Sequence, residues 1–139
     1  MSTINEALLE EMEKAINAAE RWTGQKAKRM TLVTERGEPI HYQFGIGFEI
    51  APGETGLTPS LIIAAIEAAM KRVGEFISAN CHEHFVRAEP EISHDTNFDT
   101  KAHEWLGYMR GTMIGVGADV GPAKAQKAAA PETVSFAKA

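Results

Sequence analysis

Four of the five histidines lie between residues 82 and 103, in a stretch that also holds Asp95 and Asp99. Neutral imidazole is a common metal ligand, and side chains two residues apart share one face of a strand. His82 and His84 could therefore reach one divalent metal, with His94 completing the site after a turn. No His-Glu-x-x-His or paired Cys-x-x-Cys motif is present. The cluster leaves open a metal-dependent hydrolase, a group that changes charge with pH, or histidines exposed on an acidic strand.

A glycine-rich loop, residues 51–58, connects an expected strand to an expected helix. Backbone amides and the positive end of a helix dipole suit a phosphate or carboxylate. The Lys-Ser/Thr pair of a phosphate-binding P-loop is missing, and Glu54 would repel an anion. The alternatives are a small-ligand protein, for a phosphate or nucleotide, and a plain strand-to-helix connection. The candidate ligand-binding residues here are Thr55, Gly56, Thr58 and Ser60, assisted by Lys28 and Arg29.

The clearest pattern in the chain is Ile-His-Tyr-Gln-Phe-Gly-Ile-Gly-Phe-Glu-Ile over residues 40–50. Large apolar residues recur at every second position, which predicts a strand with one apolar face. Gly45 and Gly47 share the other face. Each costs about 0.5–1 kcal/mol relative to alanine, so a close approach to the backbone is expected there. The group that packs against these glycines could be an alanine-rich helix of this chain, the same strand of a second subunit, or a flat ligand.

Other patterns predict the elements around this strand. Thr3 and Glu6 form a capping box, which begins a helix over residues 3–22 with an apolar stripe at Leu8, Met12, Ala15, Ala19 and Trp22. Thr58 before Pro59 begins a second helix, which ends near Asn80. Strands are expected at residues 29–35 and 83–93, with Pro90 placing the latter at a sheet edge. A third helix is expected over residues 99–114, with its stripe at Ala102, Trp105, Leu106, Met109 and Met113.

The element order α-β-β-α-β-α predicts an α+β fold with a single domain over residues 1–116. Its antiparallel sheet of about three strands is centred on residues 29–50 and is packed by the helices at 59–80 and 3–22. Residues 117–139 are small, polar and aperiodic, and we expect a low-complexity, mobile C-terminal tail.

Composition excludes several classes of function. The net charge of −5 argues against a general nucleic-acid binder. One cysteine, Cys81, cannot form an intrachain disulfide, and at a helix C-terminus it is a poor nucleophile. The N-terminus lacks the features of a secretory signal, and charged residues interrupt the most apolar stretch, 61–77, so we expect no membrane span. A cytoplasmic protein of a small bacterial or phage-like type fits these features.

No arrangement of residues in the sequence predicts catalysis, and no cofactor is indicated apart from a possible divalent metal at the histidines. Charge is segregated along the chain, with acidic segments before Gly24 and after Cys81 and a basic segment between Lys26 and Arg36. Such patches suit docking to a protein partner or self-association. The leading hypothesis is therefore a non-enzymatic interaction protein that acts as a homo-oligomer, in its simplest form a homodimer. It would inhibit or scaffold another macromolecule.

Overall fold

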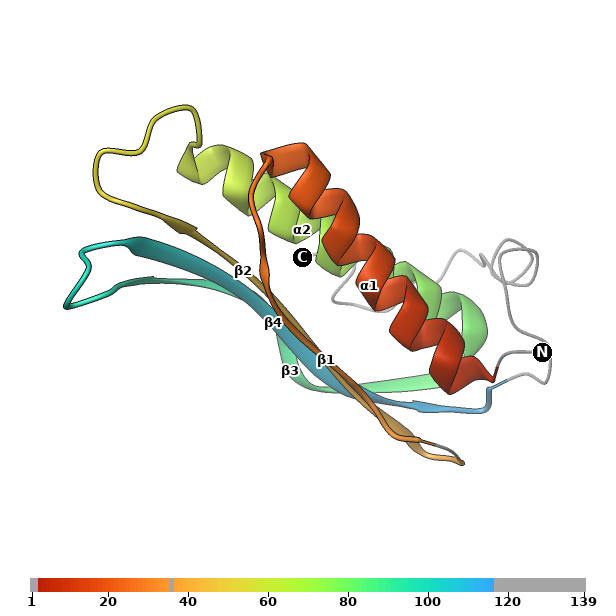
Figure 1. The fold of residues 1–139 in the computed structure, drawn as a ribbon. Coiled ribbons are helices and arrows are strands. Elements are labelled where there is room, and N and C mark those ends of the chain that lie inside the picture. Colours follow the sequence, from red (N-terminus) through yellow and green to blue (C-terminus); the bar gives the residue numbers. More distant parts are fainter. Residues whose placement is uncertain (1–2, 36, 117–139) are drawn as a thin grey trace.

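The computed structural model describes residues 3–35 and 37–116. Within this part of the chain, two helices lie side by side on one face of a single antiparallel sheet, and neither of them covers its other face (Figure 1). The α+β class is thus confirmed. The elements, in chain order, are α1 (Ile4–Thr23), β1 (Lys28–Val33), β2 (Ile40–Ile50), α2 (Pro59–Asn80), β3 (Glu83–Thr96) and β4 (His103–Ile114).

Both helices begin at the residues that their capping patterns predict. The Thr3 hydroxyl accepts a hydrogen bond from the Glu6 amide, and the Glu6 carboxylate accepts one from the Thr3 amide. Thr58 accepts from the Leu61 amide at the start of α2. The expected stripe of α1 is wrong at Trp22, which is 53% exposed. The helix is ending there, and Gly24 follows in the left-handed conformation with a φ of 71°.

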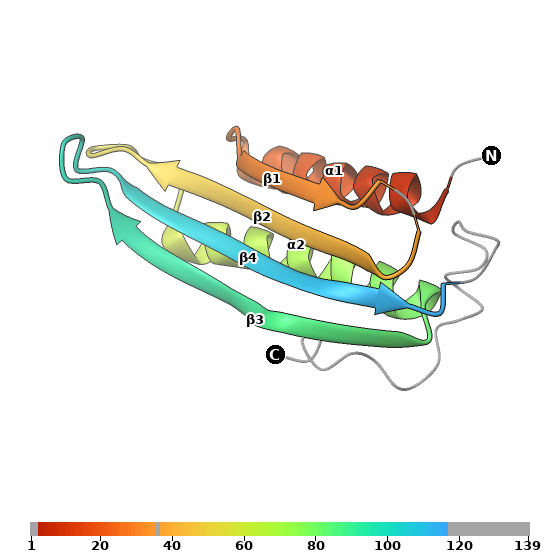
Figure 2. The same ribbon diagram turned by 90° about the horizontal axis from the view of Figure 1, so that it is seen from below.

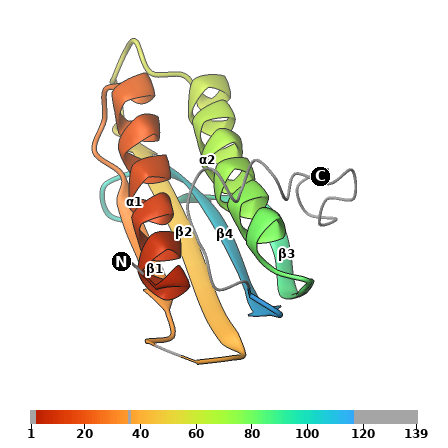
Figure 3. The same cartoon turned by 90° about the vertical axis from the view of Figure 1, so that its right-hand side faces the viewer.

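The helices pack against each other as well as against the sheet (Figure 3). They run in opposite directions, and the Arg72 guanidinium donates from Nε to Glu11 Oε2 at 2.5 Å across their solvent side. Neither described helix is long and apolar enough to cross a membrane.

The sheet order is β1-β2-β4-β3, and every neighbouring pair is antiparallel. The two expected strands β1 and β2 pair as a hairpin, with Met30 opposite Gly45. The third predicted strand, β3, is also confirmed and lies at an edge of the sheet. Its register with β4 shifts on either side of Ala88, and Pro90 falls within the second shift, where a missing backbone donor is tolerated.

The helix predicted over residues 99–114 is wrong. These residues form a turn and then β4, which pairs with β2 on one side and β3 on the other. The order is therefore α-β-β-α-β-β, and the sheet has four strands. Along β4 the side that faces the helices carries Trp105, Gly107, Met109, Gly111 and Met113. This period of two was hidden because two of the five positions are glycine.

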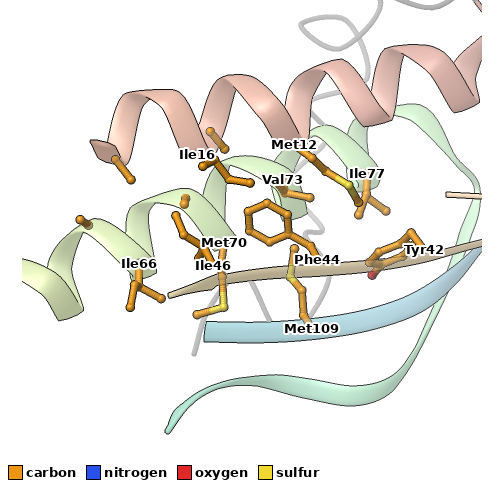
Figure 4. Close-up of a cluster of buried hydrophobic side chains, with 14 of the residues drawn as sticks. Met12, Ile16, Tyr42, Phe44, Ile46, Ile66, Met70, Val73, Ile77 and Met109 are labelled. Atoms are coloured by element: carbon orange, nitrogen blue, oxygen red, sulfur yellow. The ribbon is translucent and has the colours of Figure 1, made fainter. Parts of the chain in front are cut away.

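The core lies between the helices and the apolar face of β2, as the alternation of β2 predicts. Ile40, Tyr42, Phe44, Ile46 and Phe48 are each at most 2% exposed. Figure 4 shows Phe44 beneath side chains of both helices, beside Met109 of β4. Burial of this apolar surface positions β2 and β4 at the centre of the sheet. The predicted tail, 117–139, lies outside the described residues.

Candidate functional site

The face of the sheet opposite the helices, which we call the open face, is built from alternate residues of all four strands (Figure 2). The register places Gly45 of β2 between Met30 of β1 and Tyr108 of β4 on this face. The described residues that the register assigns to it are Lys28, Met30, Leu32, His41, Gln43, Gly45, Gly47, Glu49, Phe85, Glu91, Ser93, Asp95, Glu104, Leu106, Tyr108, Arg110 and Thr112.

Side chains of the two flanking strands occupy the space next to the two glycines of β2. A methyl group at Gly45 would lie 3.3 Å from Met30 Cβ and 3.6 Å from Tyr108 Cδ1, and one at Gly47 would lie 3.0 Å from Leu106 Cδ1. The absence of a side chain at each glycine therefore leaves room for the side chains of β1 and β4 above β2. The expectation that an alanine-rich helix of this chain covers them is wrong, because both helices pack on the other face.

The centre and flanks of the open face are apolar and exposed. Seven large hydrophobic residues are exposed in the described part of the chain, and four of them share this face. Met30 is 48% exposed, Leu32 55%, Phe85 53% and Leu106 39%. Single exposed residues of this kind are ordinary, whereas here four of them lie on one side of the sheet.

One end of the open face, the basic end, holds two arginines in a shallow depression of about 80 Å³. Arg110 extends from β4, and Arg87 comes from the point where the register of β3 shifts. A bulge of this kind re-aims a side chain, and here it brings Arg87 to the same depression. His41, Gln43 and Leu32 complete the wall on this face. Within residues 3–35 and 37–116, neither guanidinium forms an ion pair.

Hydrogen bonds fix the polar wall of that depression. Gln43 Oε1 accepts from the Tyr108 hydroxyl at 3.1 Å, and the Gln43 amide nitrogen is a further donor in this wall. His41 Nδ1 lies 3.1 Å from Thr112 Oγ1. The depression thus presents cationic and neutral donors, which suit an oxyanion such as a carboxylate.

The opposite end of the open face, the acidic end, carries Glu49, Asp95 and Glu104. Lys28 pairs with two of them, with Nζ 2.5 Å from Glu104 Oε2 and 3.6 Å from Glu49 Oε2. The hydrogen bond to Glu104 is the main cause that raises the pKa of Lys28. Asp95 stands directly opposite Glu104 in the register and is exposed. With three carboxylates and one ammonium, this end is net negative.

The candidate ligand residues do not converge. Lys28 lies on the open face, whereas Arg29 lies on the helix face and contacts Glu13 and Glu20 at 2.5 and 3.0 Å. Glu20 also accepts from the Ala27 amide, and this hydrogen bond is the main cause that lowers its pKa. Thr58 is engaged as the cap of α2. Thr55, Gly56 and Ser60 are exposed in the 51–60 loop and first turn, away from Gly45 and Gly47 in the middle of β2.

The histidines of the predicted metal site are also dispersed. His84 lies on the helix face, where Nε2 contacts the Tyr42 hydroxyl, and burial lowers the pKa of His84 to about 4. His82 packs beside Gly115, while His94 Nε2 lies 2.9 Å from Nδ1 of His103 at the far end of β3 and β4. Within the described part of the chain, no three His, Cys, Asp or Glu side chains form a group that could hold a metal ion.

Sequence reasoning pointed to the open face through Gly45 and Gly47 but missed its arginines. The helix predicted over residues 99–114 contains Arg110, and the strand predicted over residues 83–93 contains Arg87 without a shift of register. The available signal was the alternation of Leu106, Tyr108 and Arg110 along β4, once the glycines between them are counted as small inward residues.

Comparison with known proteins adds no family to this description. No protein-family model matches the chain, and neither the curated proteins nor the solved structures include one that is significantly similar.

Proposed function

We propose that this chain is a non-enzymatic interaction protein that works as a homodimer, with the open face as its contact surface. The observation that carries the proposal is the group of four exposed apolar residues on that face. Water released from this surface would drive association, because burying apolar area contributes about 25 cal/mol per Å² before the costs of binding. Pairing two copies would also present two helical faces outward, as a scaffold for another macromolecule.

The open face has the size that a stable dimer needs. Strands lie about 4.8 Å apart and rise about 3.3 Å per residue. The four strands hold 6, 11, 14 and 12 residues, and together they offer about 700 Å² per copy. A typical specific interface buries about 800 Å² per partner. Sheets packed face to face lie about 10 Å apart, which suits the methionine, leucine and aromatic side chains present.

The composition of the face fits the usual anatomy of an interface. Aromatic residues, methionine and arginine are enriched at such surfaces, and charged residues are displaced toward the rim. On the open face Met30, Tyr108 and Leu106 lie around the central glycines, while the arginines and carboxylates lie at opposite ends.

Light scattering coupled to gel filtration tests the proposal on the full chain. The wild type should have twice the chain mass of 15.1 kDa. Leu106→Gln should weaken the dimer at least tenfold, since it places an amide in the apolar centre. Leu9→Gln is the matched control, because Leu9 is 40% exposed, like Leu106 at 39%, but lies on α1. A monomeric wild type at high concentration, or equal dimerisation of the two variants, would overturn the proposal.

A further inference from the structure

We infer that the Arg87–Arg110 depression is a carboxylate-binding site, and that its ligands are carboxylates from the acidic end of a second copy. The inference rests on the proposed function and specifies how the two copies are oriented. Its starting point is that positive and negative charges are unevenly distributed between the two ends of the open face. Two guanidiniums line one depression without an ion pair among the described residues, whereas the other end carries three carboxylates and one ammonium, which pairs with two of them.

The size of the depression favours a side-chain group as its ligand. Sites for small molecules and cofactors commonly enclose about 300–1,000 Å³. The depression holds about 80 Å³ and is open to the face. A guanidinium binds a carboxylate through two parallel hydrogen bonds, so a single Asp or Glu side chain is the ligand that fits.

The position of the two charged ends selects one of two possible symmetric dimers. Face-to-face packing needs a twofold axis within the interface. An axis parallel to the strands would bring the basic end of each copy against the basic end of the other. An axis that runs across the strands instead reverses the strand direction, so that each basic end meets an acidic end. Like charges oppose the first arrangement and opposite charges favour the second.

The register identifies which residues would meet. Arg110 and Glu104 lie three residues on either side of Gly107 in β4, about 20 Å apart along the strand. An axis across the strands at Gly107 places Arg110 over the partner's Glu104. By the same operation Arg87 lies over the partner's Asp95, because Asp95 is opposite Glu104 and Arg87 adjoins the residue opposite Arg110. Two such pairs, repeated by symmetry, give four charge contacts in the dimer.

The predicted contact between Arg87 and Asp95 allows a clean test, because neither residue forms an ion pair within the described chain. In the full-length chain, Arg87→Asp and Asp95→Arg should each weaken the homodimer at least tenfold, because like charges then meet at both symmetric positions. An equimolar mixture of the two variants should recover a dimer within about threefold of wild type, since each position then holds opposite charges. Lys71→Asp, on the exposed side of α2, is the charge-matched control.

The outcomes separate this inference from the proposed function. A wild type that stays monomeric overturns both. If Leu106→Gln breaks the dimer but the two charge variants dimerise like wild type, the open face is the interface and the carboxylate site is wrong. If Arg87→Asp weakens the dimer, Asp95→Arg does not, and mixing gives no recovery, the carboxylate comes from another segment or protein, and the inference is overturned. Recovery on mixing, measured by sedimentation velocity, supports it.

Discussion

A methyl group at Gly107 should destabilise the fold by forcing α2 away from the sheet. A Cβ at this position would lie 2.3 Å from Ile66 Cγ2 and 3.2 Å from Met70 Sδ. Ile66 is fully buried, and a β-branched side chain in a helix has essentially one rotamer, so it cannot swing aside. Overpacking lowers the free energy of unfolding by about 1–3 kcal/mol. Replacing glycine also reduces the entropy of the unfolded chain, which raises the free energy of unfolding by about 0.4–1 kcal/mol. Gly107→Ala should therefore lower the free energy of unfolding by about 1–2 kcal/mol.

Urea denaturation followed by circular dichroism measures this loss, and two further variants make the test specific. Gly45→Ala adds the same methyl group on the open face, where the nearest atom is Met30 Cβ at 3.3 Å, and should change stability by less than about 0.5 kcal/mol. Ile66→Ala alone should lower the free energy of unfolding by about 2–5 kcal/mol. The double variant with Gly107→Ala should lose about 1 kcal/mol less than the sum of the two single losses, because the smaller side chain leaves room for the added methyl group. Strict additivity, or equal losses for the two glycine variants, would refute the steric argument.

Three other predictions concern stability. Because burial lowers the pKa of His84 to about 4, the unfolded chain binds a proton that the folded chain excludes, so stability should fall as pH drops from about 6.5 to about 4. Allowing for the partial exposure of His84, this loss is about 2 kcal/mol, and His84→Gln should remove it from urea titrations at the two pH values. Phe44→Ala should cost about 3–5 kcal/mol in chemical denaturation, and a loss below about 1 kcal/mol would show that β2 is not central. Thr3→Ala should lower the thermal midpoint through a loss of about 1 kcal/mol, since the Glu6 amide then lacks its acceptor, whereas Thr3→Ser should restore the cap.

The parts of the fold that local chemistry determines could be predicted from the sequence. Both helix starts follow from a hydroxyl beside orphan amides, and β2 follows from an uninterrupted period of two. The β1–β2 hairpin follows from the short connection between the strands. In each case the residues that carry the signal are close together in the chain.

The assignment of β4 failed because tertiary packing removed its signal. Gly107 is small because Ile66 of α2 occupies the space of its side chain, and a Cβ at Gly111 would lie 2.6 Å from the Tyr42 hydroxyl. An observer of the sequence sees apolar residues at Trp105, Leu106 and Met109, which match a helical stripe equally well. The arginines of the basic end were missed for the same reason, since their common depression exists only once β3 and β4 are paired.

The central position of β4 has a consequence for the order of folding. The last strand of the described chain is inserted between β2 and β3, and it joins residues as distant as His41 and Thr112, which are 71 positions apart. Contacts of such high sequence separation form slowly, because the loop between them must be closed first. Until residue 103 and its successors are available, β3 has no strand partner and one edge of β2 is bare. A nascent chain can therefore form both helices and the β1–β2 hairpin before it can complete the sheet, and it is open to wrong strand pairing during that interval.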